Sequence, residues 1–325
     1  MKRLALHFVQ RCGIFAFSRV ATARMARILT YHNFCADDEP HAESVSVSML
    51  RDHLEYLRRN FRVVPLAQIL EQLRNARQLD SRSVALTVDD GRRNCYEFLF
   101  PLLKEFQIPA TFFVVSCFIQ GEDWIWTDKL LWLRDHVHRP AELARDKIGD
   151  LFRQLNRLRP EIRDKRIEDL AVRMGVLIPK EAPAPYTPCS WSELQEMANS
   201  GLVEIGSHTV THPILSSITD EESWRELTLS RAQIEEHIGK TVSLFCFPNG
   251  TPDDYRPSQV RQVQDAGYQG AVVTRFGMAA HGDDLYQLPR MGVGRRFDPL
   301  LFAKRLAGAD YYQVKLQSSL GWKES

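Results

Sequence analysis

Strand-like and helix-like segments alternate along most of this chain, and this alternation restricts the fold more than any other feature of the sequence. Short runs rich in Val, Leu, Phe and Thr occupy residues 27–34, 61–64, 84–88 and 110–115, and segments with helical spacing follow the first three. A regular β-α-β succession predicts an α/β protein with a parallel sheet covered by helices. With the strands expected beyond residue 190 the count reaches about eight, which favours a closed or nearly closed β/α barrel over an open sheet.

The alternation is interrupted between about residues 121 and 190. This region begins with Trp124, Trp126 and Trp132, continues with many charged residues and ends in a proline-dense segment. We interpret it as a mostly helical insertion, closed by an extended linker, that could form a wall of a substrate cleft; its tryptophans are expected to pack internally rather than stack on sugars. The expected domains are an amphipathic basic helix over 1–27, a barrel over 28–307 with helical insertion 121–190, and a polar tail over 308–325.

The composition is that of a soluble globular protein with almost no net charge. The chain has 325 residues, 44% of them hydrophobic, and 42 basic against 41 acidic side chains give a net charge of +1. This balance gives no indication of a nucleic-acid partner. Six cysteines without CxxC spacing argue against a zinc-thiolate module or a disulfide framework and weakly favour a reducing compartment.

The N-terminal segment is basic and amphipathic but does not have the pattern of an export signal. No run reaches the ~18 apolar residues of a spanning helix, and Gln10 and Arg11 interrupt the apolar pieces. We therefore expect a cytoplasmic protein, with residues 1–26 either docked on their own domain or lying on the inner face of an anionic membrane.

Two adjacent carboxylates, Asp89 and Asp90, end the apolar run 84–88 and are followed by Gly91. Barrel enzymes carry their chemistry at the carboxyl ends of their strands. Neighbouring side chains of an extended chain point in opposite directions, so one acid can face a metal and the other the substrate, with Gly91 allowing the turn. An acid ahead of the helix expected after Asn94 would also fit an ordinary helix cap.

A pair of histidines after a later strand supplies the complementary ligands. His208 and His212 are four residues apart and are followed by Pro213. One helical turn would place both imidazoles on the same side. Two histidines and a carboxylate form a ligand set with open positions, which suits Zn²⁺ best and would also accept Co²⁺, Ni²⁺, Fe²⁺ or Mn²⁺.

These residue types suit the hydrolysis of an amide. A divalent ion acidifies its water and polarises the carbonyl, and a carboxylate that is not a ligand accepts the proton of the water. A backbone N–H in the turn 248–250 could contact the oxyanion, although the same residues also fit a plain β-turn.

Three motifs together resemble one known family. TVDDG at 87–91, SHTVTHP at 207–213 and FCFPNG at 245–250 are similar to the motifs of the polysaccharide deacetylases, the NodB-homology enzymes of carbohydrate esterase family 4. The resemblance covers roughly residues 28–293 and implies a distorted, nearly closed β/α barrel of seven to eight strands and metal-dependent removal of N-acetyl groups from amino-sugar glycans. We expect the substrate to be an N-acetylated polysaccharide or its lipid-linked precursor. By position it implies a catalytic base at Asp89, metal ligands at Asp90, His208 and His212, and an oxyanion contact from the amide of Asn249.

The chain departs from the family pattern at two points. Phe247 stands where many members have an arginine that pairs with the catalytic base; Arg290 could take over that pairing, or it could be a solvated surface residue. The late histidine that protonates the leaving amine has no clean match, since His281 lies in a glycine-bearing segment typical of a loop. The general acid is thus unassigned. His32, at the end of the first strand, could line the cleft, but a hydrogen-bonded core histidine is the expectation.

Two alternatives to a deacetylase acting on an N-acetylated glycan remain. One is an amidase or deformylase acting on a small or lipid-linked substrate with the same fold. The other is a glycan-binding homologue with weak catalysis, because its general acid is missing. An open groove would suit a polymer, and a closed pocket would suit a small molecule.

Overall fold

The barrel predicted from the sequence is present and contains seven parallel strands. The computed structural model describes residues 14–39, 44–136, 143, 147–295, 297–308 and 311. Around the barrel the strands follow the order β1 (Arg27–Tyr31), β10 (Leu288–Gly292), β9 (Gly270–Phe276), β8 (Leu244–Cys246), β7 (Val203–Ser207), β6 (Ala110–Val114) and β5 (Ser83–Val88). Pairing of β1 with β5 closes the ring, and β4 (Arg62–Val63) pairs with the start of β5. The fold class is therefore confirmed; β2 (Phe34–Cys35) and β3 (Val45–Ser46) form a separate two-stranded sheet.

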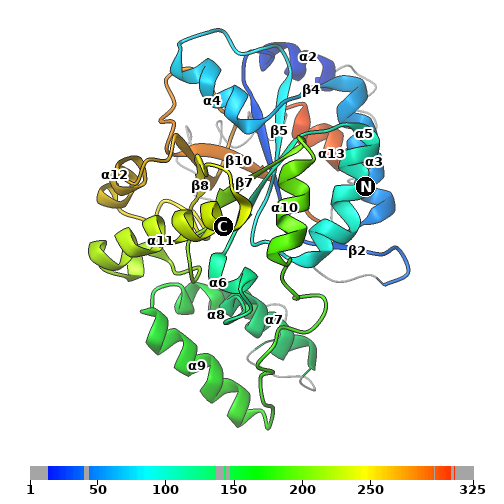
Figure 1. Cartoon of the computed structure of the whole chain (residues 1–325). Helices are drawn as coiled ribbons and strands as arrows, with labels where there is room; N and C mark the ends of the chain where they lie inside the picture. Colours follow the sequence, from blue (N-terminus) through cyan, green and yellow to red (C-terminus); the bar gives the residue numbers. More distant parts are fainter. Residues whose placement is uncertain are drawn as a thin grey trace.

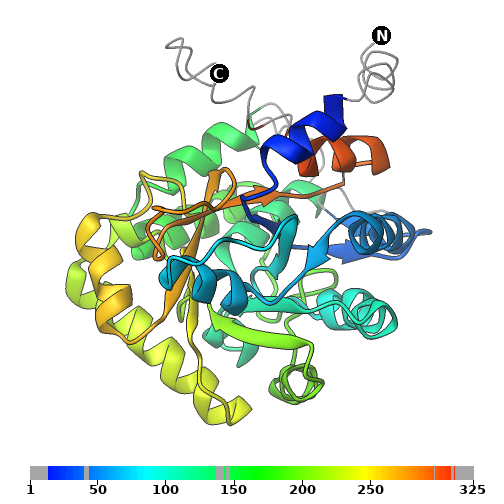
Figure 2. The same cartoon turned by 90° about the horizontal axis from the view of Figure 1, so that it is seen from above.

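Helices surround this barrel when it is seen from above (Figure 2). Two of them begin with a capping box, in which Ser190 and Glu193, or Thr219 and Glu222, each accept a hydrogen bond from the backbone N–H of the other. The helices outside the insertion are α2 (Ile14–Ala21), α3 (Val47–Asn60), α4 (Leu66–Arg74), the π-helical turn η1 (Cys95–Leu99), α5 (Phe100–Phe106), α6 (Ser116–Ile119), α10 (Trp191–Asn199), the 3₁₀ turn η2 (Leu215–Ser217), α11 (Asp220–Ile238), α12 (Pro257–Asp265) and α13 (Pro299–Leu306).

The barrel interior is apolar at one end and polar at the other. The apolar cluster contains Ile28, Ala85, Phe113, Leu244 and Val272 from the strands and Leu66, Ile69, Leu70 and Leu73 from α4. The helix approaches so closely that a Cβ at Gly270 would lie 2.5 Å from Leu70. Near the carboxyl ends of the strands the buried residues become polar, and Arg290 donates a hydrogen bond to Thr87 Oγ1 at 3.1 Å. The polar end is where a reactive site can form.

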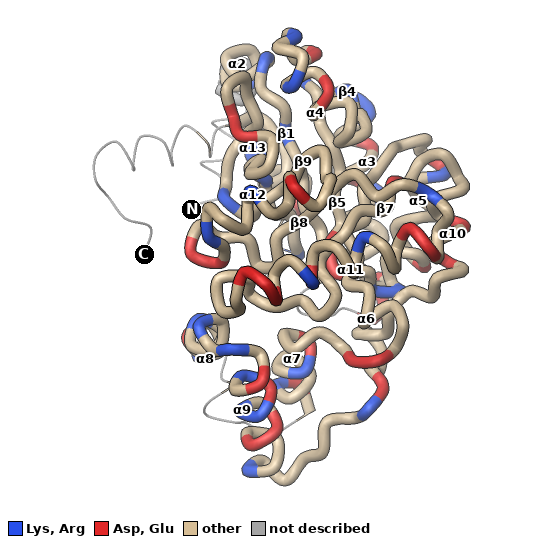
Figure 3. The backbone as a smooth tube through the Cα atoms, turned by 60° about the vertical axis from the view of Figure 1, so that its left-hand side comes forward, with Lys and Arg blue, Asp and Glu red and all other residues tan. Residues whose placement is uncertain are grey.

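The insertion lies at this polar end. Its helices α7 (Trp126–His136), α8 (Ile148–Leu155) and α9 (Pro160–Arg173) gather on one side of the barrel (Figure 1). Basic and acidic segments alternate along α8 and α9 (Figure 3). Trp124, Trp126 and Trp132 are only 3–7% exposed, and the rings of Trp124 and Trp132 meet edge to face, which agrees with the expected internal packing.

The N-terminal helix docks on the barrel through α13, and the two helices lie next to each other in Figure 2. Its polar residue Ser18, and Thr22 just beyond its end, are buried. Helix α2 ends at Ala21, and residues 1–13 lie outside the described part of the chain, as does most of the predicted tail 308–325. Among the described residues no helix is long and apolar enough to span a membrane. The domain limits and the membrane contact stay predictions.

Candidate active site

A cleft of about 590 Å³ opens at the carboxyl ends of the strands. It is lined by five of the six residues proposed from the sequence, namely Asp89, Asp90, His208, His212 and Asn249. The strand register explains their meeting, because Tyr31 pairs with Val88 and Val114 pairs with Ser207. Residues that directly follow these pairs therefore emerge side by side on the rim.

The sixth residue, Arg290, lies beneath the cleft and holds Asp89. Its Nη1 and Nη2 each donate a hydrogen bond of 2.7 Å to one oxygen of Asp89, and both side chains are buried. Burial alone would raise the pKa of Asp89, but the charge and hydrogen bonds of the Arg290 guanidinium lower it by a larger amount. The pKa of Asp89 therefore lies below its ordinary value. Asp89 is therefore an ionised carboxylate at neutral pH. Of the two interpretations of Arg290, the structure favours pairing over a solvated surface position.

Asp90 turns away from its neighbour because the chain takes up a left-handed conformation. Asp90 has a φ of 80° and Gly91 a φ of 91°. A Cβ at Gly91 would lie 2.8 Å from Ile119, so the turn needs glycine for space as well as for φ. Neither acid caps the helix that follows; the side chain of Asp90 instead faces the two histidines.

The imidazoles of His208 and His212 lie close together as predicted, but the backbone between them is not the predicted helical turn. The prediction of a helical turn was wrong, because the segment after β7 is a loop in which Thr209 and His212 have φ values of 71° and 55°. The loop is held by Glu226 of α11, which accepts hydrogen bonds from the backbone of Val210 at 2.7 Å and of Thr211 at 3.0 Å. These contacts and the left-handed residues bring the imidazoles together without a helix.

Three side-chain atoms converge in a geometry that fits a divalent cation. Asp90 Oδ1 lies 3.7 Å from His208 Nε2 and 3.8 Å from His212 Nε2, whereas ligands around a tetrahedral zinc are about 3.4 Å apart. His208 Nδ1 lies 2.7 Å from the carbonyl of Cys246, so its proton is assigned there and Nε2 keeps a free lone pair. Burial lowers the pKa of both imidazoles, that of His212 to about 3, so both are neutral at pH 7 as ligands must be.

Asn249 lies in the expected turn after β8. It has a φ of 57° and is followed by Gly250 at 71°. The turn is fixed by its side chain, which donates to Asp254 at 2.6 Å, and by its carbonyl, which accepts from Thr274 at 2.5 Å. The Asn249 side of the turn faces the cleft, and its contact with an oxyanion stays a prediction.

Sequence reasoning misplaced one residue of the site. His32 is not a core histidine: its side chain is 49% exposed, lines the cleft and places Nε2 3.7 Å from Asp89 Oδ2. The reason is that β1 ends at Tyr31, so His32 is the first residue beyond the sheet. The sequence could have indicated this position, because His32 directly follows a strand just as Asp89 does. His281 is an exposed loop residue, as expected, and contacts the carbonyl of Arg77.

Two further residues of the site were not predicted at all. Arg92, two positions after Asp90, and Asp128, on α7, form a buried ion pair at the cleft wall. Arg92 also contacts Asp90, with Nη1 2.6 Å from Oδ2. Arg92 could have been noticed as a charge beside the paired acids, but no pattern connects it with an aspartate 36 residues away.

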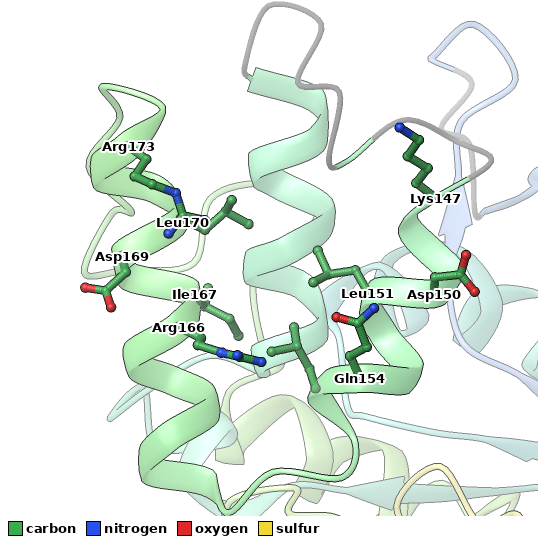
Figure 4. Close-up of a pocket in the computed structure, with 10 residues that line it drawn as sticks. Lys147, Asp150, Leu151, Gln154, Arg166, Ile167, Asp169, Leu170 and Arg173 are labelled. Carbon is green, nitrogen blue, oxygen red and sulfur yellow. The ribbon is translucent and has the colours of Figure 1, made fainter.

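A cavity of about 630 Å³ elsewhere on the insertion is unrelated to this chemistry (Figure 4). It lies between α8 and α9, with Leu151, Ile167 and Leu170 pointing into it and the ends of Lys147 and Arg173 at its margin. None of the residues predicted for the site lines it. Helix α8 separates it from the cleft, which its residues Ile148 and Phe152 line.

The comparison with families identifies the class of protein. The family described as Polysaccharide deacetylase matches residues 76–271, and the chain belongs to this family. Two solved structures share the fold over 87% of this chain. The Streptococcus pyogenes deacetylase PplD is 15% identical with a TM-score of 0.60 and 98% of its chain covered, and IcaB from Ammonifex degensii is 20% identical with a TM-score of 0.59 and 97% covered.

Curated relatives match this chain over different shares of their own length. The poly-beta-1,6-N-acetyl-D-glucosamine N-deacetylase of Escherichia coli K12 is 29% identical over 185 residues, which is 56% of this chain. The match spans only 20% of the length of that protein. YxkH of Bacillus subtilis is 20% identical over 267 residues, covering 82% of this chain and 70% of YxkH.

Proposed function

We propose that this chain is a metal-dependent hydrolase that removes N-acetyl groups from the amino sugars of a polysaccharide or of its lipid-linked precursor. The observation that supports the proposal most is the division between two adjacent acids: both oxygens of Asp89 are held by Arg290, whereas Oδ1 of Asp90 faces two neutral imidazoles. One acid is thus a base and the other a ligand. Membership of the deacetylase family agrees with this arrangement.

Asp90, His208 and His212 would hold the cation, most favourably Zn²⁺ for a carboxylate with two imidazoles. A bound divalent ion lowers the pKa of its water and polarises the acetyl carbonyl. Asp89 accepts the proton of the attacking water, with Arg290 keeping it ionised and oriented.

Two further groups complete the proposed machinery. The backbone N–H of Asn249 would donate to the oxyanion as the carbonyl becomes tetrahedral. His32, the half-exposed imidazole 3.7 Å from Asp89, is the group positioned to deliver a proton to the leaving amine. This assignment would supply the general acid that no motif of the sequence provides.

The direct test is acetate release from N-acetylglucosamine oligomers by the purified protein supplied with Zn²⁺ or Co²⁺. β-1,6-linked oligomers are tested first because the name of the E. coli relative specifies that polymer. Asp89→Asn should abolish release while leaving metal bound, since Asp89 is not a ligand. Asp265→Asn, at an exposed position on α12, is the matched control and should retain full activity.

Acetate release that survives Asp89→Asn would contradict the role of that residue. If the wild-type protein binds metal and glycan at stoichiometry but releases no acetate from any N-acetylated substrate, the proposed hydrolase is wrong and a glycan-binding protein remains. Release from small amides or formylated amino sugars alone would place the chain among amidases or deformylases.

A further inference from the structure

A buried chain of three charges connects the ligand Asp90 with the helical insertion. Arg92 lies between two aspartates: its Nη1 is 2.6 Å from Asp90 Oδ2, and its Nε and Nη2 lie 3.0 and 2.6 Å from the two oxygens of Asp128. All three side chains are at most 7% exposed. Charges buried to this degree interact strongly, because little water screens them.

Arg92 divides the two oxygens of Asp90 between two tasks. Oδ2 faces the guanidinium, and Oδ1 faces the imidazoles of His208 and His212. A carboxylate held in this way can offer a cation only one oxygen, whereas a free carboxylate can bind through both. Arg92 also has a backbone contact, in which Nη1 donates to the carbonyl of His32 at 3.4 Å.

Asp128 determines how strongly Arg92 acts on that ligand. It belongs to α7, the first helix of the insertion, and is fully buried. Its bidentate contact draws the guanidinium charge away from Asp90. Without the charge of Asp128, the positive charge of Arg92 would be balanced by Asp90 alone, and the site would attract a cation less strongly.

We propose that Arg92 and Asp128 are positioning residues of the metal site: Arg92 restricts Asp90 to ligation through one oxygen, and Asp128 offsets the charge of Arg92. The helical insertion therefore sets metal affinity in addition to forming a wall of the cleft. This inference rests on the ligand set of the proposed function and not on the substrate or on turnover.

Two variants of Arg92 and Asp128 distinguish the effect of Asp128 on charge from the effect of Arg92 on the coordination by Asp90. Asp128→Asn removes one negative charge and should weaken Zn²⁺ binding by about tenfold or more, the usual size of such an effect on a ligand's supporting residue. The double variant Arg92→Met and Asp128→Leu removes one charge of each sign, so affinity should stay within about threefold of wild type. Asp123→Asn, at a more exposed acid paired with Lys129 near the same helix, is the control and should leave affinity unchanged.

Zn²⁺ affinity is measured by competition with a chromogenic chelator, and coordination by the visible absorption of the Co²⁺-loaded protein. In the double variant Asp90 is free to bind through both oxygens, so the Co²⁺ bands should lose intensity as the coordination number rises. Circular dichroism of the metal-free proteins shows whether each variant is folded. If Asp128→Asn does not fold, the double variant alone decides, through its Co²⁺ spectrum.

Two results would overturn the inference: Zn²⁺ affinity of folded Asp128→Asn equal to that of wild type, or a Co²⁺ spectrum of the double variant identical to that of wild type. Neither measurement uses a substrate. A wild-type protein that binds metal as expected but releases no acetate therefore contradicts the proposed function only. A wild-type protein that binds no metal contradicts the ligand set itself.

Discussion

The ion pair between Asp89 and Arg290 should dominate the energetics of the site, and a double-mutant cycle can measure it. The pair is formed by two hydrogen bonds of 2.7 Å, and the side chains are 2% and 0% exposed. Removing one partner of such a pair leaves a buried charge and costs about 3–5 kcal/mol, whereas an exposed pair contributes about 0–1 kcal/mol. Arg290→Met should therefore lower the free energy of unfolding by about 3–5 kcal/mol.

The double variant of the cycle also removes the charge of Asp89, which Arg290→Met alone would leave buried without a partner. In the double variant Asp89→Asn and Arg290→Met neither partner is ionised, so most of the loss should be recovered and the coupling free energy should reach about 3 kcal/mol. Complete recovery is not expected, because Arg290 also donates to Thr87 at 3.1 Å and to the carbonyl of Val273 at 3.2 Å. With a total stability of about 10 kcal/mol, the middle of the usual range, each variant should remain folded in buffer.

The assay is equilibrium unfolding in urea, with chelator present so that metal binding does not contribute. Arg275→Met is the matched control, since Arg275 is exposed and contacts Gln287 only at 3.4 Å; it should change stability by less than about 0.5 kcal/mol. A coupling free energy below about 1 kcal/mol would show that the pair behaves as a solvated one, and the assignment of Arg290 as the partner of the base would be wrong. In turnover, Arg290→Met should lower kcat with KM little changed, because Arg290 is absent from the cleft lining.

Four further outcomes are expected. Burial lowers the pKa of His53 from 6.5 to about 4, so between these pH values the imidazole is protonated in the unfolded chain but not in the folded one. The free energy of unfolding should therefore fall by about 3 kcal/mol as the pH drops from above 6.5 to 4. The urea midpoint of His53→Gln should lack this pH-dependent step. Gly250→Ala, with φ at 71° and a Cβ 3.0 Å from the carbonyl of Phe247, should destabilise by about 1–2 kcal/mol and lower kcat, as seen by urea unfolding and acetate release. Chelation should lower Tm, with Zn²⁺ at 1,000 times its Kd restoring about 4 kcal/mol of stability by calorimetry. Deleting residues 1–26 should reduce co-sedimentation with anionic vesicles if this segment contacts membranes, and unchanged co-sedimentation would contradict that contact.

The barrel could be predicted because its determinants are local and repeated. Each strand carries a short apolar run, and the break at residue 121 marks the insertion, whose interior the sequence does not describe. The position of Asp89 and Asp90 followed from the same logic, since residues that end parallel strands share one rim. Patterns of this kind persist in the sequence regardless of the details of packing.

Convergence of side chains was harder to predict, because it depends on backbone conformations that are not periodic. The histidines meet through left-handed residues in a loop, and the spacing that suggested a helical turn led to the wrong route. Arg290 was left undecided because its depth depends on the pairing of β10 with β9, which contains an irregularity between Leu288 and Arg290. Contacts between an insertion and a barrel have no sequence signature, which is why Asp128 was missed.

The different roles that we propose for Asp89 and Asp90 follow from the arginine that each of them contacts. Arg290 comes from within the barrel and contacts both oxygens of Asp89, which keeps this carboxylate ionised. Arg92 comes from the loop and contacts one oxygen of Asp90, leaving the other directed at the imidazoles. In the proposed function, two identical side chains of one motif thus become a proton acceptor and a ligand through their partners. Because Arg92 is balanced by Asp128, the insertion takes part in that distinction, and changes in it should affect metal binding before they affect the fold.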